Sequence, residues 1–170
     1  MTDGKRKQDS GFYGHEFLLW LFYKTSEDSY FDLADFALEN IEVFLEDQIS
    51  LESVVGEGFA EKIKSDDITG QKDVFDSIRE GRIPAEVRVR IIKGQYEWVF
   101  TLSAMPLSVK SVKLPSDNSK DEFETMEFRL LMMEMLDNII RGLFSMFLME
   151  RDGGELTGTL KQFLSLEKNE

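Results

Sequence analysis

The sequence has no cysteine among its 170 residues. This absence excludes disulfide bonds, thiolate zinc sites, iron–sulfur clusters and a cysteine nucleophile. There is a single histidine, His15, so any Ser–His pair or multi-histidine metal site would have to be built around it. We interpret His15 as a capping or partly exposed residue at the start of an apolar helix. Walker, dinucleotide and nucleophile-elbow motifs are also absent, so we expect no metal, no cofactor and no enzymatic activity.

No hydrophobic run has the composition of a membrane span. The most hydrophobic stretch, Leu130–Met149, contains Glu134, Asp137 and Arg141, and each of these costs roughly 2.5–3.5 kcal/mol at a bilayer centre. The short apolar run Phe17–Tyr23 is not followed by the small-residue cleavage site that ends a signal peptide. We therefore expect a cytoplasmic protein without membrane contact.

Positive charge is scarce relative to negative charge. The 20 basic residues stand against 33 acidic ones, a net charge of -13, which argues against a surface that is basic all over. Hydrophobic residues make up 42% of the chain and include 14 phenylalanines, enough for one well-packed core. We expect a flexible N-terminal tail over 1–11, a single domain over 12–150, and a short terminal helix or tail over 151–170.

The spacing of apolar residues predicts an α+β fold. Helical spacing and capping residues indicate helices at 14–24, 70–80 (capped by Thr69) and 122–150, with a further short one at 157–166. Alternating patterns indicate strands at 41–45, 49–54, 59–64, two within 85–104, and 107–114, with a turn at Asp47-Gln48. Because short turns join consecutive strands, we expect an antiparallel sheet of hairpins packed by helices on one face, with a long C-terminal helix.

The segment 85–104 has the best-defined pattern. A two-residue turn at Lys93-Gly94 would place all apolar partners on one face, pairing Ile91 with Tyr96, Val89 with Trp98 and Val87 with Phe100. Arg90 would then meet Glu97 on the opposite face. Lysine is a poor first turn residue, however, because a type I′ turn needs a positive φ there. A longer loop that shifts the pairing is the alternative.

The long C-terminal helix has more apolar residues than one packing face needs. One stripe runs along it at helical spacing: Leu131, Met135, Ile139, Leu143 and Met146. One interpretation is that this stripe forms a dimer interface or binds another protein partner. The other is that the first helix or the short terminal helix covers the surplus.

Four basic residues fall on the predicted strands. Arg88 and Arg90 lie in the first half of the hairpin, and Lys110 and Lys113 lie in the strand that follows it. Such a cluster in an acidic chain predicts a local positive strip that could hold a phosphate backbone. The alternative is ordinary salt bridging on a solvated strand face.

Two segments together resemble the RdgC recombination-associated proteins. The stretch Ile63–Pro115, which includes the paired lysines of Ser108-Val109-Lys110-Ser111-Val112-Lys113, is similar to the C-terminal half of that family, and GHEFLLWLFY at 14–23 resembles another of its motifs. The similarity spans about 12–149 and rests on pattern and order. The family's N-terminal half is not included, so a closed ring does not follow from it.

The resemblance implies a non-enzymatic protein. Proteins of this family bind double-stranded DNA without marked sequence preference, form ring-shaped dimers around it and restrain recombinase activity. Lys110 and Lys113 match the family's basic pattern, and Arg88 and Arg90 extend it. Two alternatives stay open: a self-associating interaction module without DNA binding, and an acidic protein that mimics DNA.

Overall fold

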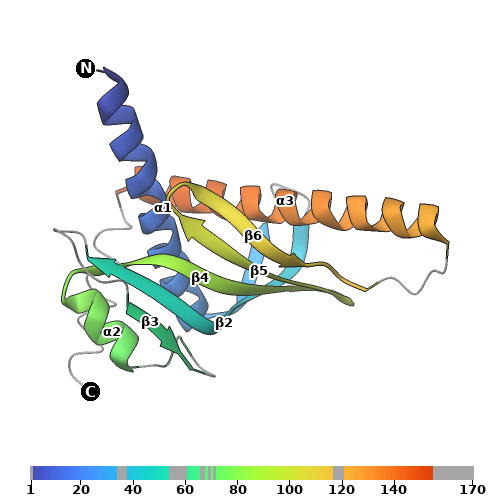
Figure 1. The fold of residues 1–170 in the computed structure, drawn as a ribbon, viewed down its shortest axis with the longest axis horizontal. Helices are drawn as coiled ribbons and strands as arrows, with labels where there is room; N and C mark the ends of the chain where they lie inside the picture. Colours follow the sequence, from blue (N-terminus) through green and yellow to red (C-terminus); the bar gives the residue numbers. More distant parts are fainter. Residues whose placement is uncertain are drawn as a thin grey trace.

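The computed structural model describes residues 2–33, 38–53, 61–65, 68, 70, 72–116 and 121–154. In chain order the elements are α1 (Thr2–Glu27), β1 (Tyr30–Leu33), β2 (Leu38–Ser53), β3 (Glu61–Lys64), α2 (Lys72–Arg79), β4 (Arg82–Lys93), β5 (Tyr96–Ala104), β6 (Leu107–Lys113) and α3 (Glu122–Asp152). Figure 1 shows α1 and the long α3 lying behind the sheet, with α2 at one end of it.

The sheet is antiparallel throughout, which confirms the predicted α+β class. Its strand order is β1-β2-β4-β5-β6, and β3 pairs with β2 beside β1. Alternate residues of the central strands, such as Val89 in β4 and Phe100 in β5, are buried under the helices. The described residues share one hydrophobic core, to which α1 contributes Trp20 and α3 contributes Ile139. One face of the sheet is thus covered and the other is open.

The β4–β5 hairpin has the predicted faces but a different register. Its turn is Gly94-Gln95, and Ile91 pairs with Trp98 rather than with Tyr96. Gly94 has a φ of 59° and occupies the position where a type II′ turn requires glycine. The shift of two residues keeps every apolar side chain on the core face, because side chains alternate with a period of two. The predicted turn at Lys93-Gly94 is therefore wrong.

The predicted turn at Asp47-Gln48 is also wrong, because β2 is one strand of 16 residues. Its register against β4 shifts between the pairs Leu45–Val89 and Ile49–Val87. The polar dipeptide is thus accommodated as a bulge, where extra residues leave the ladder without ending the strand. The long β4 makes this possible, because it offers partners on both sides of the bulge.

The helices match the prediction in number and order within the described residues. Helix α1 begins at Thr2, inside the segment expected to be a tail, and extends to Glu27. Helix α2 ends before Gly81, whose φ of 97° suits the predicted stop. The predicted Thr69 cap and the predicted short helix at 157–166 lie outside the described residues.

Helix α3 spans Glu122–Asp152, close to the prediction, and Asp121 caps it by accepting a hydrogen bond from the Phe123 amide. Its middle is attached to the sheet by the Trp98 indole, whose Nε1 donates to the Met132 carbonyl at 3.0 Å. No helix among the described residues is sufficiently long and apolar to span a membrane.

Polar contacts join the C-terminal end of α3 to α1. The Trp20 indole donates to Glu150, and Lys24 lies 2.7 Å from the same carboxylate. On the sheet side of α1, the His15 Nδ1 donates to the Pro84 carbonyl at 3.0 Å. His15 is half-buried, as one of its two interpretations expected, but it lies within α1 and so does not cap the start of a helix.

Candidate nucleic-acid interface

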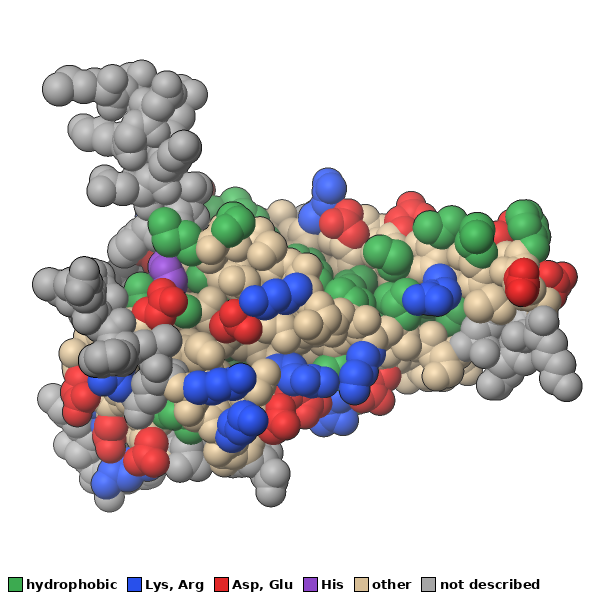
Figure 2. All heavy atoms as spheres, viewed as in Figure 1, with side chains coloured by type: hydrophobic (Ala, Val, Ile, Leu, Met, Phe, Trp, Pro, Cys, Tyr) green, Lys and Arg blue, Asp and Glu red, His purple; other side chains and the backbone are tan. Residues whose placement is uncertain are grey.

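The four predicted basic residues come from two strands, β4 and β6, and lie on the open face of the sheet. The pairing Arg88–Thr101–Lys110 forms one cross-strand row through β4, β5 and β6. The pairing Arg90–Val99–Lys113 forms the next row. Residues that pair across antiparallel strands point to the same face, so both rows face away from the helices. Figure 2 shows this face, with basic side chains gathered across the sheet and acidic ones between them.

A β-bulge in β6 brings Lys110 and Lys113 to the same face. Residues three apart in a regular strand point to opposite faces. The register of β6 against β5 shifts between Thr101 and Val99, and Ser111 there has a φ of 55°. The extra residue restores both lysines to the open face. The three-residue repeat SVK-SVK is the sequence signal that anticipates this bulge.

Carboxylates interrupt the basic rows. Lys110 Nζ lies 2.9 Å from Glu86 Oε2. Arg90 Nε forms an ion pair with Glu46 at 2.7 Å, but the geometry is not that of a hydrogen bond. The Arg90 guanidinium also lies over the Phe44 ring, 4.8 Å from its centre. The strip is therefore mixed in charge, and the alternative of ordinary salt bridging holds for Lys110 and Arg90.

Arg88 and Lys113 differ from the other two. Within the described part of the chain, neither makes an ion pair. Arg88 is half-buried and Lys113 is exposed, and they come from different rows and different strands. These two cations are available to a phosphate group without first losing a carboxylate partner.

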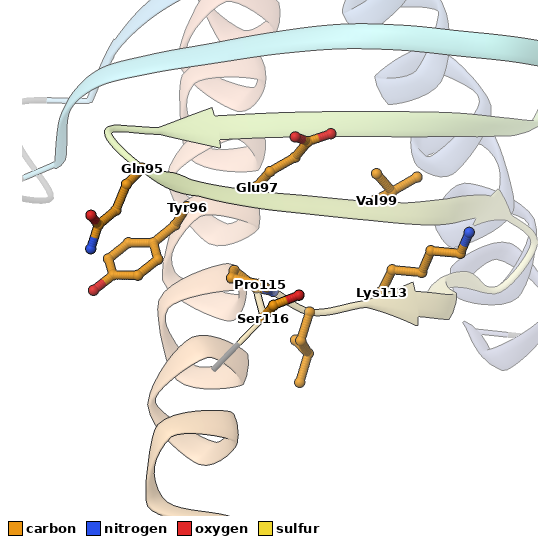
Figure 3. A pocket seen from close by; sticks show the side chains of 8 residues that line it. Gln95, Tyr96, Glu97, Val99, Lys113, Pro115 and Ser116 are labelled. Atoms are coloured by element: carbon orange, nitrogen blue, oxygen red, sulfur yellow. The ribbon is translucent and has the colours of Figure 1, made fainter. Parts of the chain in front are cut away.

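A hollow of about 520 Å³ lies at the Lys113 end of its row. It is lined from β5 by Tyr96, Glu97 and Val99, and from the other side by Lys113 and the segment 114–116 (Figure 3). It forms because β6 pairs with β5 only from Val99 onward, so the first residues of β5 have no neighbour strand on that side. Its lining has one acidic and one basic residue, Glu97 and Lys113, so the hollow is mixed in charge like the strip beside it.

The predicted interface stripe on α3 does not form one surface. Ile139 and Leu143 are buried in the chain's own core, so they offer no surface to a partner and their assignment is wrong. Met135 and Met146 are half-buried against that core. Only Leu131, 53% exposed, faces solvent. The chain's own core thus covers most of the helix face that the spacing had assigned to a partner.

No known family model matches this chain, and no curated protein matches it either.

Proposed function

We propose that the open sheet face binds the phosphate backbone of duplex DNA without sequence preference. The observation that supports this is the alignment of Arg88, Arg90, Lys110 and Lys113 in two adjacent rows on one face. Phosphate contacts of this kind give affinity and position but no sequence readout. The resemblance to the RdgC proteins points to the same ligand, and to a role in restraining recombinase access to the duplex rather than in catalysis.

The four basic residues would contribute to phosphate binding in different ways. Arg88 and Lys113 would bind phosphate groups directly. The Lys110–Glu86 pair is exposed on both sides, with side chains 51% and 37% accessible, and such pairs are worth at most about 1 kcal/mol. A phosphate can therefore displace Glu86 from Lys110. Arg90 is held by Glu46 and Phe44 and would contribute mainly to the local potential.

The net charge of -13 confines binding to this face. Elsewhere the acidic surface repels the duplex, so contacts outside the two rows should add little affinity. With about three phosphate contacts, affinity should fall by roughly 40-fold between about 50 and 200 mM salt. A duplex should bind more tightly than a single strand of equal length, because its charge density is higher.

Fluorescence anisotropy with labelled duplex and single-stranded DNA at these two salt concentrations tests the proposal. The double variant Arg88→Ala/Lys113→Ala should weaken duplex binding and reduce the salt slope by about 2. The matched control is Arg141→Ala/Lys72→Ala, which removes the same charge from α3 and α2, where both residues are exposed. Equal weakening by the two double variants would contradict the proposal, as would no duplex binding by the unmodified chain at the lower salt.

A further inference from the structure

The first turns of α3 have a second apolar stripe that the core does not use. Its members are spaced by three, four and three residues and are 55–67% exposed: Phe123, Met126, Leu130 and Met133. At about 100° per residue, this stripe lies on the side of the helix away from Met132 and Leu136, which are buried. Figure 1 shows this end of α3 extending past the sheet.

An apolar stripe on each side is typical of a helix that packs on both sides. A shallow groove of about 450 Å³ runs along the stripe, lined by Met126, Leu130 and Met133 with Glu122 and Arg129 at its rim. Spacing of three and four residues is the pattern by which one helix packs along another. Exposed methionines adapt to the shape of such a partner. The geometry therefore suits a second helix.

The charges around the stripe indicate which helix would fit. Between 122 and 137 the chain has five acidic residues and one basic residue, Arg129. At helical spacing Glu127 and Glu134 flank one side of the stripe, and Glu122 flanks the other. A second copy of α3 would bring these carboxylates against their own equivalents, which is unfavourable. Basic flanks on the partner would instead be attracted.

We propose that the 122–137 half of α3 docks an amphipathic helix of a partner protein whose apolar stripe is flanked by lysine or arginine. This surface lies on a different element from the basic sheet face. It therefore adds a protein partner to the proposed function and does not depend on DNA binding.

A dye-labelled helical peptide of leucine and lysine, roughly 18 residues long with leucines spaced three and four apart, serves as the probe. Its counterpart with glutamate in place of lysine is the control peptide. The lysine peptide should bind the full chain in fluorescence anisotropy, and the glutamate peptide should not. Equal binding of both peptides, or binding of neither, would overturn the proposal.

The adjacent residues Leu130 and Leu131 provide matched variants, because they are 61% and 53% exposed and only Leu130 belongs to the stripe. Leu130→Asp should weaken binding of the lysine peptide by about tenfold or more, while Leu131→Asp should leave it nearly unchanged. Both substitutions add the same negative charge, so non-specific attraction would change equally. Equal effects of the two would refute docking at the stripe.

Sedimentation velocity tests whether a second copy of this chain, rather than a partner protein, covers the stripe. The unmodified chain should sediment in the same way as Leu130→Asp. A dimer that Leu130→Asp dissociates would assign the stripe to a second copy of this chain and overturn the proposal of a partner helix.

Discussion

Lys110 and Lys113 lie three residues apart in β6 yet point to the same face of the sheet, because the strand bulges at Ser111. The two lysines pair with Thr101 and Val99, which are two residues apart in β5. The candidate interface therefore depends on one backbone irregularity as much as on the four basic side chains.

Ser111→Val should disfavour the bulge, because a β-branched residue rarely adopts a φ of 55°. With all of its residues in regular alternation, β6 would turn Lys113 away from the open face. We expect duplex binding to weaken to the level of Lys113→Ala, measured by anisotropy at low salt. Ser111→Gly is the control: it retains the bulge and relieves the φ of 55°, so it should preserve binding and stabilise the fold by up to about 1 kcal/mol. Unchanged binding in Ser111→Val would show that the bulge does not position Lys113.

Removing the carboxylate that competes for Lys110 should strengthen DNA binding. Glu86→Gln leaves the Lys110 ammonium without its ion pair at 2.9 Å, so a phosphate no longer has to displace it. We expect up to about a fivefold gain in duplex affinity, the limit for an exposed pair. Glu134→Gln on α3 removes the same charge away from the sheet and should give a smaller gain. Similar gains from both would indicate an effect of net charge alone.

Helix α1 contacts β5 at a point where only glycine fits. A Cβ added to Gly14 would lie 2.0 Å from the carbonyl oxygen of Ala104. Gly14→Ala should therefore force the helix and the strand apart and lower the free energy of unfolding by about 1–3 kcal/mol. Urea denaturation followed by circular dichroism measures this.

Gly153→Ala is the matched control for that substitution, because its added Cβ would meet nothing closer than the Met149 carbonyl oxygen at 3.4 Å. Its effect on the unfolding free energy should stay within about 0.5 kcal/mol. Equal losses in the two variants would rule out the close approach at Ala104 as the cause.

Tyr30 should titrate above its usual range. Its hydrogen bond to Glu42, followed by the charge of that carboxylate, raises the pKa of Tyr30 above 10.0. The stabilising contribution of this contact is therefore present below pH 10 and is lost as the pH rises through the raised pKa. Glu42→Gln should lower the pKa of Tyr30 toward its ordinary value in an absorbance or NMR titration.

Tyr23 provides the internal control for that titration. Burial, and then the charge of Glu27, raises the pKa of Tyr23, and Glu42 is not among the causes. Its titration should therefore be unchanged in Glu42→Gln. A parallel shift of both tyrosines would indicate a general change in the fold.

Local patterns in the sequence were sufficient to predict the fold class and the faces of the central hairpin. Val87, Val89 and Ile91 alternate with charged residues, and a period of two assigns them to one face in whatever register the strands pair. Placing Arg88 and Arg90 on the open face follows from the same period. The long α3 was predictable from its apolar spacing, and the structure adds Asp121 as its N-cap.

Only the tertiary structure decided register, strand continuity and the use of α3. Asp47 and Gln48 have turn chemistry, yet pairing with β4 on both sides holds them within one strand as a bulge. Ile139 and Leu131 are equally apolar, and the line along which α3 crosses the sheet buries the first and exposes the second. Local propensity depends on residues that are near neighbours in the chain. Strand register, strand continuity and the buried face of α3 depend on contacts between residues far apart in the chain, which no local pattern encodes.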